Sequence, residues 1–309
     1  MASDDTIETL KARLGPVGVW LGSLMAAPVE EERVAARRIE ALGYGSLWTG
    51  ERIGGREAFS HQSLLLATTE HLITGTGIAN VWARHPAAMQ GGASTVAAAY
   101  PGRFVLGLGI SHAPLVDYSG QTYAKPLAHM VGYLDGMDTE AAAGSLADQA
   151  DVPRVLAALR PHMLDLARER ADGAHPYFVP VSHTPLAREA LGPGKLLIPE
   201  QAVVLETDPT VARRVARAHM ELYLQLPNYV NNLRHLGYGD DDLSAGGSDR
   251  LVDAIVAWGD ESAIATRVAE HLSGGADHVV LQPLGSLDRA LAQLERLAPA
   301  VLDNPTVTQ

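Results

Sequence analysis

Cysteine is absent from the 309 residues of this chain. Disulfide bonds and thiolate metal ligands are therefore excluded, and the absence fits a reducing compartment, so we expect a cytoplasmic protein. No apolar run reaches the roughly 18 residues that a membrane-spanning helix needs. The first residues, MASDDTIETLKARLG, also lack the basic and apolar regions of a secretory signal. We expect no membrane partner.

Basic residues are fewer than acidic ones: 24 Lys and Arg against 36 Asp and Glu give a formal net charge of −12. Binding to nucleic-acid phosphates needs clustered cations, so we expect no nucleic-acid partner, although a local basic pocket is compatible with this charge. The G-x-S-x-G elbow and the P-loop are missing too, which argues against an α/β-hydrolase or a P-loop enzyme. No H-x-H or H-E-x-x-H spacing supports a metal site, but one built from scattered strand ends stays open.

Several segments repeat one order: a helix, a glycine near its end, and a short apolar strand. In Glu30–Leu42 the apolar residues fall on one helical face, three glutamates occupy the first turn, and Gly43 suits a left-handed C-cap. Near-continuous apolar strands indicate a parallel sheet covered by helices. We expect eight: Val17–Leu21, Ser46–Thr49, Ile73–Asn80, Phe104–Gly109, Val155–Ala158, Tyr177–Val179, Leu196–Leu205 and His278–Leu281.

Eight such strands predict an α/β fold of the (β/α)8 TIM-barrel class, as one domain over residues 1–309. An open, doubly wound sheet is the competing architecture, and the strand count favours the barrel. Two stretches exceed the repeating unit and predict extended loops after strands 4 and 7. Pro114–Asp151 contains a helix over Pro126–Met137 and an Ala/Ser/Asp-rich loop, and Leu226–Asp253 is polar and glycine-rich. Long loops on a barrel usually shape or cover the active site.

Active sites of such barrels lie at the carboxyl ends of the strands. This rule selects the polar residues that follow the predicted strands: Glu51, Arg52, Asn80, Trp82, Arg84, His85, Ser111, His112, Arg160, His162, Ser182, His183, Thr184, Glu200 and Gln201. His112 follows a glycine-rich strand end and offers a proton donor or acceptor near neutral pH. Glu51 offers a carboxylate for a ring nitrogen or a proton. The structural alternatives are a hydrogen-bonded rim histidine and an ion pair of Glu51 with Arg52, Arg56 or Arg84.

Two backbone features could receive a ligand. Gly107 and Gly109 would let a flat ring approach the fourth strand, or they mark a bulge at the rim. The segment Ala157, Ala158, Leu159, Arg160 runs into a helix that begins with Pro161. Free N–H groups, the helix dipole and Arg160 would together make an anion site there. The alternative is a capped helix with a solvated arginine.

These stretches resemble the bacterial luciferase-like superfamily, and within it the coenzyme F420 (deazaflavin)-dependent oxidoreductases. The resemblance covers about Val17 to Leu284 and is strongest in LWTGERIGGREAF, GTGIANVWARHPAA, YPGRFVLGLGISHAP, AALRPHMLDLARERADGAHPYF and LLIPEQAVVLETDP. It implies a (β/α)8 barrel, often a homodimer, with the cofactor ring against strands 3 and 4. That location corresponds to Asn80, Val81, Gly109 and Ser111.

The resemblance also implies a cofactor phosphate at Ala157, Ala158, Leu159 and Arg160, and a carboxylate after strand 2 at Glu51. A non-proline cis peptide is implied around Ala79, Asn80 and Val81. The chain departs from the sugar-phosphate dehydrogenases of the superfamily, which have a histidine at the position of Arg52 and a glutamate where His112 aligns. Their acid–base residues therefore do not transfer directly.

We expect hydride transfer between F420 and a small-molecule substrate, with Glu51 and His112 as catalytic residues and loops at Pro114–Tyr123 and Leu226–Tyr238 that gate the substrate. The alternative is an FMN-dependent monooxygenase that receives FMNH2 from a separate flavin reductase. A third hypothesis, from another class, is a barrel without catalysis that binds a partner or metabolite.

Overall fold

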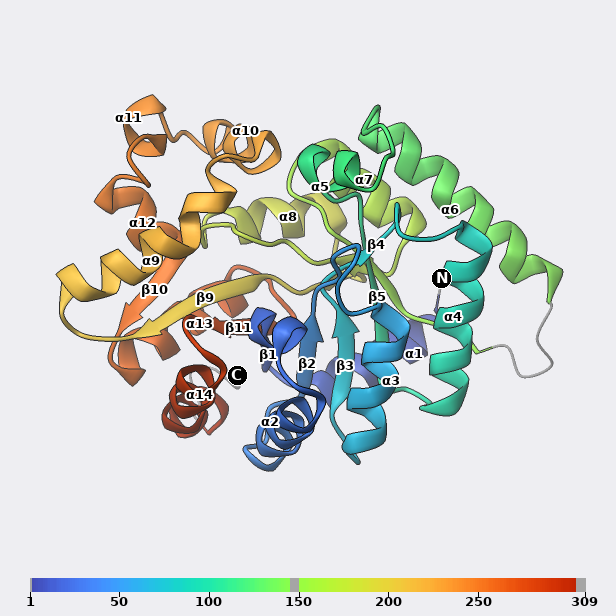
Figure 1. Ribbon diagram of the computed structural model, residues 1–309, viewed down its shortest axis with the longest axis horizontal. Coiled ribbons are helices and arrows are strands. Elements are labelled where there is room, and N and C mark those ends of the chain that lie inside the picture. Colours follow the sequence, from blue (N-terminus) through green and yellow to red (C-terminus); the bar gives the residue numbers. More distant parts are fainter. Residues whose placement is uncertain (1, 145–149, 304–309) are drawn as a thin grey trace.

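The computed structural model describes residues 2–144 and 150–303 (Figure 1). The strands are β1 Val17–Trp20, β2 Ser46–Thr49, β3 Ile73–Thr76, β4 Ala79–Asn80, β5 Phe104–Gly109, β6 Arg154–Leu156, β7 Gly173–Ala174, β8 Leu196–Leu197, β9 Glu200–Leu205, β10 Val256–Gly259 and β11 Val279–Pro283. The first helices are α1 Asp4–Leu14, the 3-10 helix η1 Gly22–Ala26, α2 Val29–Ala41, α3 Ala58–Thr68, α4 Pro86–Ala99, α5 Ala113–Tyr118, α6 Pro126–Ala143 and α7 Pro161–Arg170. They are followed by α8 His183–Leu191, α9 Pro209–Tyr223, α10 Pro227–His235, α11 Asp240–Leu243, α12 Asp249–Ile255, α13 Glu261–Ser273 and α14 Leu287–Leu302.

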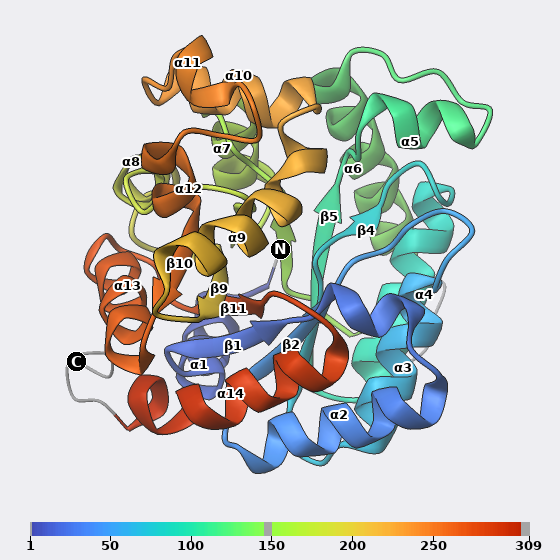
Figure 2. The same ribbon diagram turned by 60° about the vertical axis from the view of Figure 1, so that its left-hand side comes forward.

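All strand pairs are parallel, in the order β10-β9-β11-β1-β2-β3-β5-β6-β7-β8, and β4 pairs with β5. One stretch of chain joins β8, the last strand of this path, to β9, which lies between β10 and β11 at the other side. Its first part, β8, pairs with β7, and its second part, β9, pairs with β11. The sheet therefore curls, and the helices lie around its outside (Figures 1 and 2).

The interior of the curled sheet is filled at its amino-terminal end. Ile7, Leu10 and Leu14 of α1 pack against residues near the starts of several strands, including Ile73 and Val105. Within the part of the chain that the structure describes, no helix is long and apolar enough to cross a membrane. Because α1 occupies the amino-terminal end, the carboxyl ends of the strands are left to form the cavity described below.

The outer helices bury the faces that the sequence predicts. Leu291, Leu294 and Val301 of α14 lie in the same cluster as Ile39 of α2, and Ser286 caps α14 by accepting from the Arg289 N–H at 3.4 Å. After α2, Gly43 adopts the predicted left-handed conformation with φ +89°. These agreements follow from amphipathic spacing and from cap chemistry.

Three predicted elements were wrong. The sixth strand is Gly173–Ala174 rather than Tyr177–Val179, because Phe178 has φ 57° and cannot continue a strand. Ile73–Asn80 is divided into β3 and β4 by a cis peptide bond between Gly77 and Ile78. Leu226–Asp253 is not a loop but contains α10, α11 and most of α12, and the prediction missed β10 entirely.

The first long stretch is helical as well. It contains the short helix α5, and the predicted helix Pro126–Met137 continues to Ala143. Part of the predicted Ala/Ser/Asp-rich loop, residues 145–149, lies outside the described residues.

Candidate active site

A cavity of about 260 Å³ lies at the carboxyl ends of the strands. Its lining comes from the residues that end or follow β1, β2, β3, β5, β6 and β7, and from α5, α9 and α10. Most of the predicted site residues meet here: Glu51, Gly109, Ser111, His112, Ala157, Ala158 and Leu159. Asn80, Val81 and Arg160 are not among the described residues that line it.

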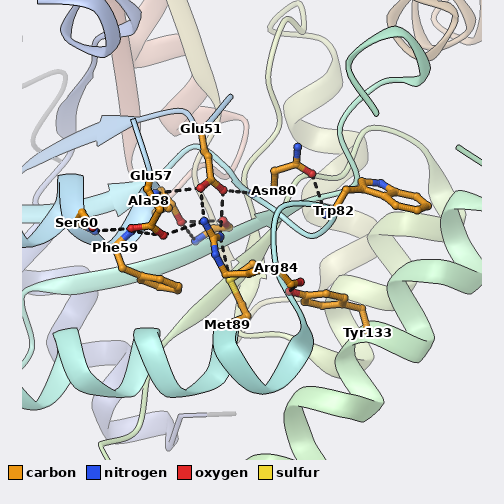
Figure 3. Close-up of polar contacts among 12 residues, drawn as sticks. Glu51, Glu57, Ala58, Phe59, Ser60, Asn80, Trp82, Arg84, Met89 and Tyr133 are labelled. Carbon is orange, nitrogen blue, oxygen red and sulfur yellow. Dashed lines mark hydrogen bonds and ion pairs between the residues drawn. The ribbon is translucent and has the colours of Figure 1, made fainter. Parts of the chain in front are cut away.

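Glu51 is held by four donors (Figure 3). Its Oε2 accepts from the Asn80 N–H at 2.8 Å and from Arg84 Nη1 at 3.0 Å. Its Oε1 accepts from the Ala58 N–H at 3.0 Å and from Arg84 Nη2. The ion pair with Arg84, the structural alternative for Glu51, is therefore present, and the carboxylate ties the end of β2 to α3 and to β4.

The cis peptide lies between Gly77 and Ile78, one residue before the predicted range. Two hydrogen bonds hold this turn: the Trp20 indole N–H donates to the Gly77 carbonyl at 3.2 Å, and the Glu51 N–H donates to the Ile78 carbonyl at 3.1 Å. The Asn80 side chain is buried and accepts from the Trp82 N–H at 3.0 Å. Asn80 thus supports the turn from behind, while Gly77 and Ile78 face the cavity.

The two glycines of β5 are required by packing within the protein. A Cβ atom at Gly107 would lie 1.9 Å from the Thr76 carbonyl oxygen, and one at Gly109 would lie 2.3 Å from the Ile78 side chain. Gly109 also lines the cavity. The absence of a side chain at Gly109 therefore makes room for the Ile78 side chain and leaves the Gly109 backbone at the cavity surface.

The turn before α7 presents backbone donors. The Ala157 N–H bonds to the Leu108 carbonyl at 2.8 Å, and His183 Nε2 donates to the Leu159 carbonyl at 2.6 Å, so the turn is fixed from both sides. Among the described residues, nothing accepts a hydrogen bond from the N–H groups of Ala158, Leu159 and Arg160. Pro161 occupies the first helical turn, as predicted.

Arg160 precedes α7 as its N-cap residue, and its exposed side chain makes no hydrogen bond or ion pair within residues 2–144 and 150–303. The free N–H groups, the positive end of the helix dipole and this cation therefore lie at the same turn. The carboxylate of Glu51, which lines the cavity, is already paired with Arg84.

His112 is half-buried, and its ring lies 5.1 Å from the ring of Tyr229 between centroids. Burial lowers its pKa from 6.5 to about 4. The imidazole is therefore neutral at pH 7, where it can donate one hydrogen bond and accept another. Because it is not an imidazolium at that pH, it cannot act as a cationic proton donor.

The family model for luciferase-like monooxygenases matches residues 16–278. The chain belongs to this family. A 5,10-methylenetetrahydromethanopterin reductase of Methanolobus tindarius is 28% identical over 153 residues, which make up 45% of this chain and 47% of that enzyme. The chain thus aligns with about half the length of this relative.

Two solved structures share the fold. An F420-dependent secondary alcohol dehydrogenase in complex with an F420-acetone adduct superposes with a TM-score of 0.74 at 14% identity, covering 93% of this chain and 99% of that one. The oxygenating constituent of 3,6-diketocamphane monooxygenase from Pseudomonas putida, in complex with FMN, gives a TM-score of 0.64 at 13% identity with the same coverage. The predicted resemblance to the luciferase-like superfamily is confirmed, and the parallel curled sheet is that of its barrels.

Sequence reasoning missed an aromatic wall of this luciferase-like cavity. Tyr177, Tyr223 and Tyr229 line it, and the Tyr177 hydroxyl bonds to the Tyr223 hydroxyl at 2.8 Å and donates to Gln282 Oε1 at 2.9 Å. Tyr223 and Tyr229 come from segments without a strand end to mark them. Tyr177 was placed inside a strand, which hid its position beyond the true end of β7.

Two further buried titratable residues are His175, which sequence reasoning missed, and Glu200, which it named as a candidate. His175 directly follows β7, lines the cavity and is 1% exposed. Glu200 begins β9, and burial raises its pKa from 4.5 to about 8. The hydrogen bond from the Phe178 N–H acts in the opposite direction and lowers the pKa, but by less. The correct end of β7 would have pointed to His175. For Glu200 the signal was available, since the charged residue interrupts an apolar strand.

Proposed function

We propose that this protein is an oxidoreductase that uses coenzyme F420 to transfer hydride to or from a small organic substrate. It would do so on a (β/α)8 barrel whose segments after the strands equivalent to barrel strands 4 and 7 cover the site. One observation carries the proposal. A largely apolar cavity lies beside a turn that combines unpaired N–H groups with a free arginine.

This chain has the groups that a phosphorylated tricyclic ring requires. Gly77, Ile78 and Gly109 offer backbone and an aliphatic side chain to one side of a flat ring, and the tyrosine wall offers aromatic faces. Ala158, Leu159 and Arg160 would hold the phosphate through backbone donors and the guanidinium. When bound, the deazaflavin would supply hydride transfer.

The residues of the chain would divide the remaining tasks. Glu51, with all four of its contacts made inside the protein, would act as a positioning residue for the turn at Gly77 and Ile78. His112 lines the cavity as a neutral imidazole and would exchange a hydrogen bond, or accept a proton, at a polar group of the substrate. Leu115, Leu222 and Leu226 would exclude water from the mouth.

A second candidate is an FMNH2-dependent monooxygenase that works with a separate flavin reductase. It is supported by the family to which the chain belongs and by the structural likeness to an FMN-bound monooxygenase. Both cofactors carry a flat ring and a phosphate, so the same turn serves either. The apolar residues at the mouth would keep water away from either cofactor.

The deciding experiment is a fluorescence titration of the purified protein with F420 and, separately, with FMN, each oxidised and reduced. We expect micromolar binding of F420. Arg160→Ala should raise the dissociation constant for F420 about tenfold, because a charge-assisted hydrogen bond contributes about 1.5–3 kcal/mol. Arg168→Ala removes the same charge from the other end of α7 and should leave the affinity unchanged.

The absence of F420 binding would refute the assignment. Tighter binding of FMNH2 with substrate-dependent oxygen consumption would favour the monooxygenase. Equal affinities of Arg160→Ala and the wild type would refute the phosphate anchor alone.

A further inference from the structure

His175 occupies the base of the cavity. Its ring stacks on Trp48, with centroids 5.0 Å apart and planes at 27°. Its Nδ1 lies 2.7 Å from the carbonyl oxygen of Ile198. Because a carbonyl oxygen only accepts, Nδ1 must carry the hydrogen. Burial lowers the pKa of His175 from 6.5 to about 4, so the ring is neutral at pH 7. The other nitrogen, Nε2, is then a bare acceptor.

This acceptor has no partner. Nε2 is buried and makes no hydrogen bond with any described residue. Nearby donors are engaged elsewhere: the Trp20 indole N–H bonds to the Gly77 carbonyl, and the Tyr177 hydroxyl bonds to Tyr223 and Gln282. A buried acceptor without a partner is unfavourable, and native proteins rarely keep one without a reason.

Gly77 packs closely beside this nitrogen. A Cβ atom at Gly77 would lie 3.0 Å from His175 Nε2 and 2.4 Å from Trp20 Nε1. A side chain at residue 77 would therefore cover the acceptor. His175 and Gly77 both line the cavity. A ring that packs against Gly77 would therefore lie next to the His175 imidazole.

We propose that His175 Nε2 accepts a hydrogen bond from a donor on the edge of the bound ring and so fixes the orientation of that ring. This inference rests on the proposed function, because it requires a flat heterocycle in the cavity. Flavin and deazaflavin share a ring N–H between two carbonyl groups, and the deazaflavin has a phenolic O–H in addition. Either group supplies the donor that Nε2 requires, and a ring without one would leave the acceptor unsatisfied.

Two substitutions separate the acceptor from the packing role of His175. In His175→Asn the amide nitrogen takes the place of Nδ1 and can still donate to the Ile198 carbonyl, but no polar atom remains at the position of Nε2. In His175→Gln the amide reaches that position and can accept. His271→Asn is the matched control, since His271 is equally buried, bonds to Thr184 and Gln201, and does not line the cavity.

The test is a fluorescence titration of each variant with F420 and with FMN. We expect His175→Asn to raise the dissociation constant about tenfold, His175→Gln to recover most of the affinity, and His271→Asn to bind like the wild type. Equal weakening for both ligands would identify the shared ring N–H as the donor, and weakening for F420 alone would identify the phenolic O–H. Wild-type affinity in His175→Asn, or an equal loss in His271→Asn, would overturn the inference.

A second measurement uses the intact protein. In ¹⁵N-labelled wild type, the Nε2 resonance of His175 should shift upfield when the ring binds, as an imidazole acceptor does when it gains a hydrogen bond. An unchanged resonance at saturating ligand would overturn the inference while leaving the proposed function standing. Failure of the wild type to bind either ring would overturn both.

Discussion

The buried carboxyl of Glu200 should make the free energy of unfolding depend on pH, and Glu200→Gln should abolish this dependence. The side chain is 2% exposed at the start of β9. Its Oε2 accepts a 3.2 Å hydrogen bond from the Phe178 N–H, and its Oε1 has no partner among the described residues. Burial raises its pKa from 4.5 to about 8, which keeps the carboxyl protonated in the folded protein at pH 7.

The sign of the effect follows from proton linkage. The unfolded chain releases this proton near pH 4.5, whereas the folded protein retains it up to about pH 8. The contribution of the Glu200 carboxyl to the free energy of unfolding is therefore fully present below pH 4.5 and is lost as the pH rises through 8. Each pKa unit corresponds to about 1.4 kcal/mol, so the loss amounts to at most about 5 kcal/mol across this window.

Glu200→Gln keeps the shape of the protonated side chain and cannot ionise. We expect the variant to be about as stable as the wild type at pH 5 and several kcal/mol more stable at pH 8.5. Urea unfolding at half-unit pH intervals measures both curves, and Glu221→Gln on α9 serves as an exposed control. Parallel curves for wild type and Glu200→Gln from pH 5 to 8.5 would refute the assignment of a neutral, buried carboxyl.

Two further predictions concern the framework of the cavity. Glu51→Gln leaves Arg84 without its buried partner and should lower the free energy of unfolding by about 3 kcal/mol. Glu57→Gln removes a half-exposed partner of the same arginine and should lower it by about 1 kcal/mol. Equal losses in urea unfolding would contradict the buried ion pair of Glu51 with Arg84. Gly107→Ala forces the backbone of β5 away from Thr76 and should cost several kcal/mol, while Gly132→Ala, where a Cβ meets nothing within 4 Å, should stabilise α6 by up to about 1 kcal/mol. Similar thermal midpoints for these two glycine variants would contradict the close packing at Gly107.

Two buried strands could be predicted to the residue, and others, such as β1 and β11, to within one or two residues at their ends. Ser46–Thr49 and Phe104–Gly109 coincide with β2 and β5, because a strand buried on both faces shows itself by composition alone. The strand β7 could not be found in this way, because it consists of Gly173 and Ala174. A Cβ atom at Gly173 would lie 2.1 Å from the Leu196 carbonyl, so close strand packing selects a residue that resembles a turn signal.

Predicted site residues that lie near the end of a strand were found, and residues that come from helices were missed. Ser111 and His112 line the cavity because they follow β5, whose end was predicted to the residue. Ala157 and Ala158 also line it, although the predicted strand Val155–Ala158 included them and β6 ends at Leu156. The aromatic wall was missed, because Tyr223 and Tyr229 come from α9 and α10 and reach the cavity only through tertiary packing. Helices were not expected in Leu226–Asp253, since glycines and polar residues obscured their periodicity.

The electrostatics of the cavity support one kind of ligand over others. Of the described titratable residues that line the interior, Glu51 is compensated by Arg84, and His112 and His175 are neutral at pH 7, so the interior presents little net charge. Cationic side chains lie instead at the rim, at Arg52, and beyond it, at Arg160.

A neutral, flat ring with an anionic tail matches this division, because the ring would enter the apolar interior and the tail would stay with the cations and the backbone donors. A ligand that carried its charge on the ring itself would have to lose its hydration inside an uncharged cavity. The same argument explains why Glu51 is better suited to hold the cavity in shape than to exchange protons within it.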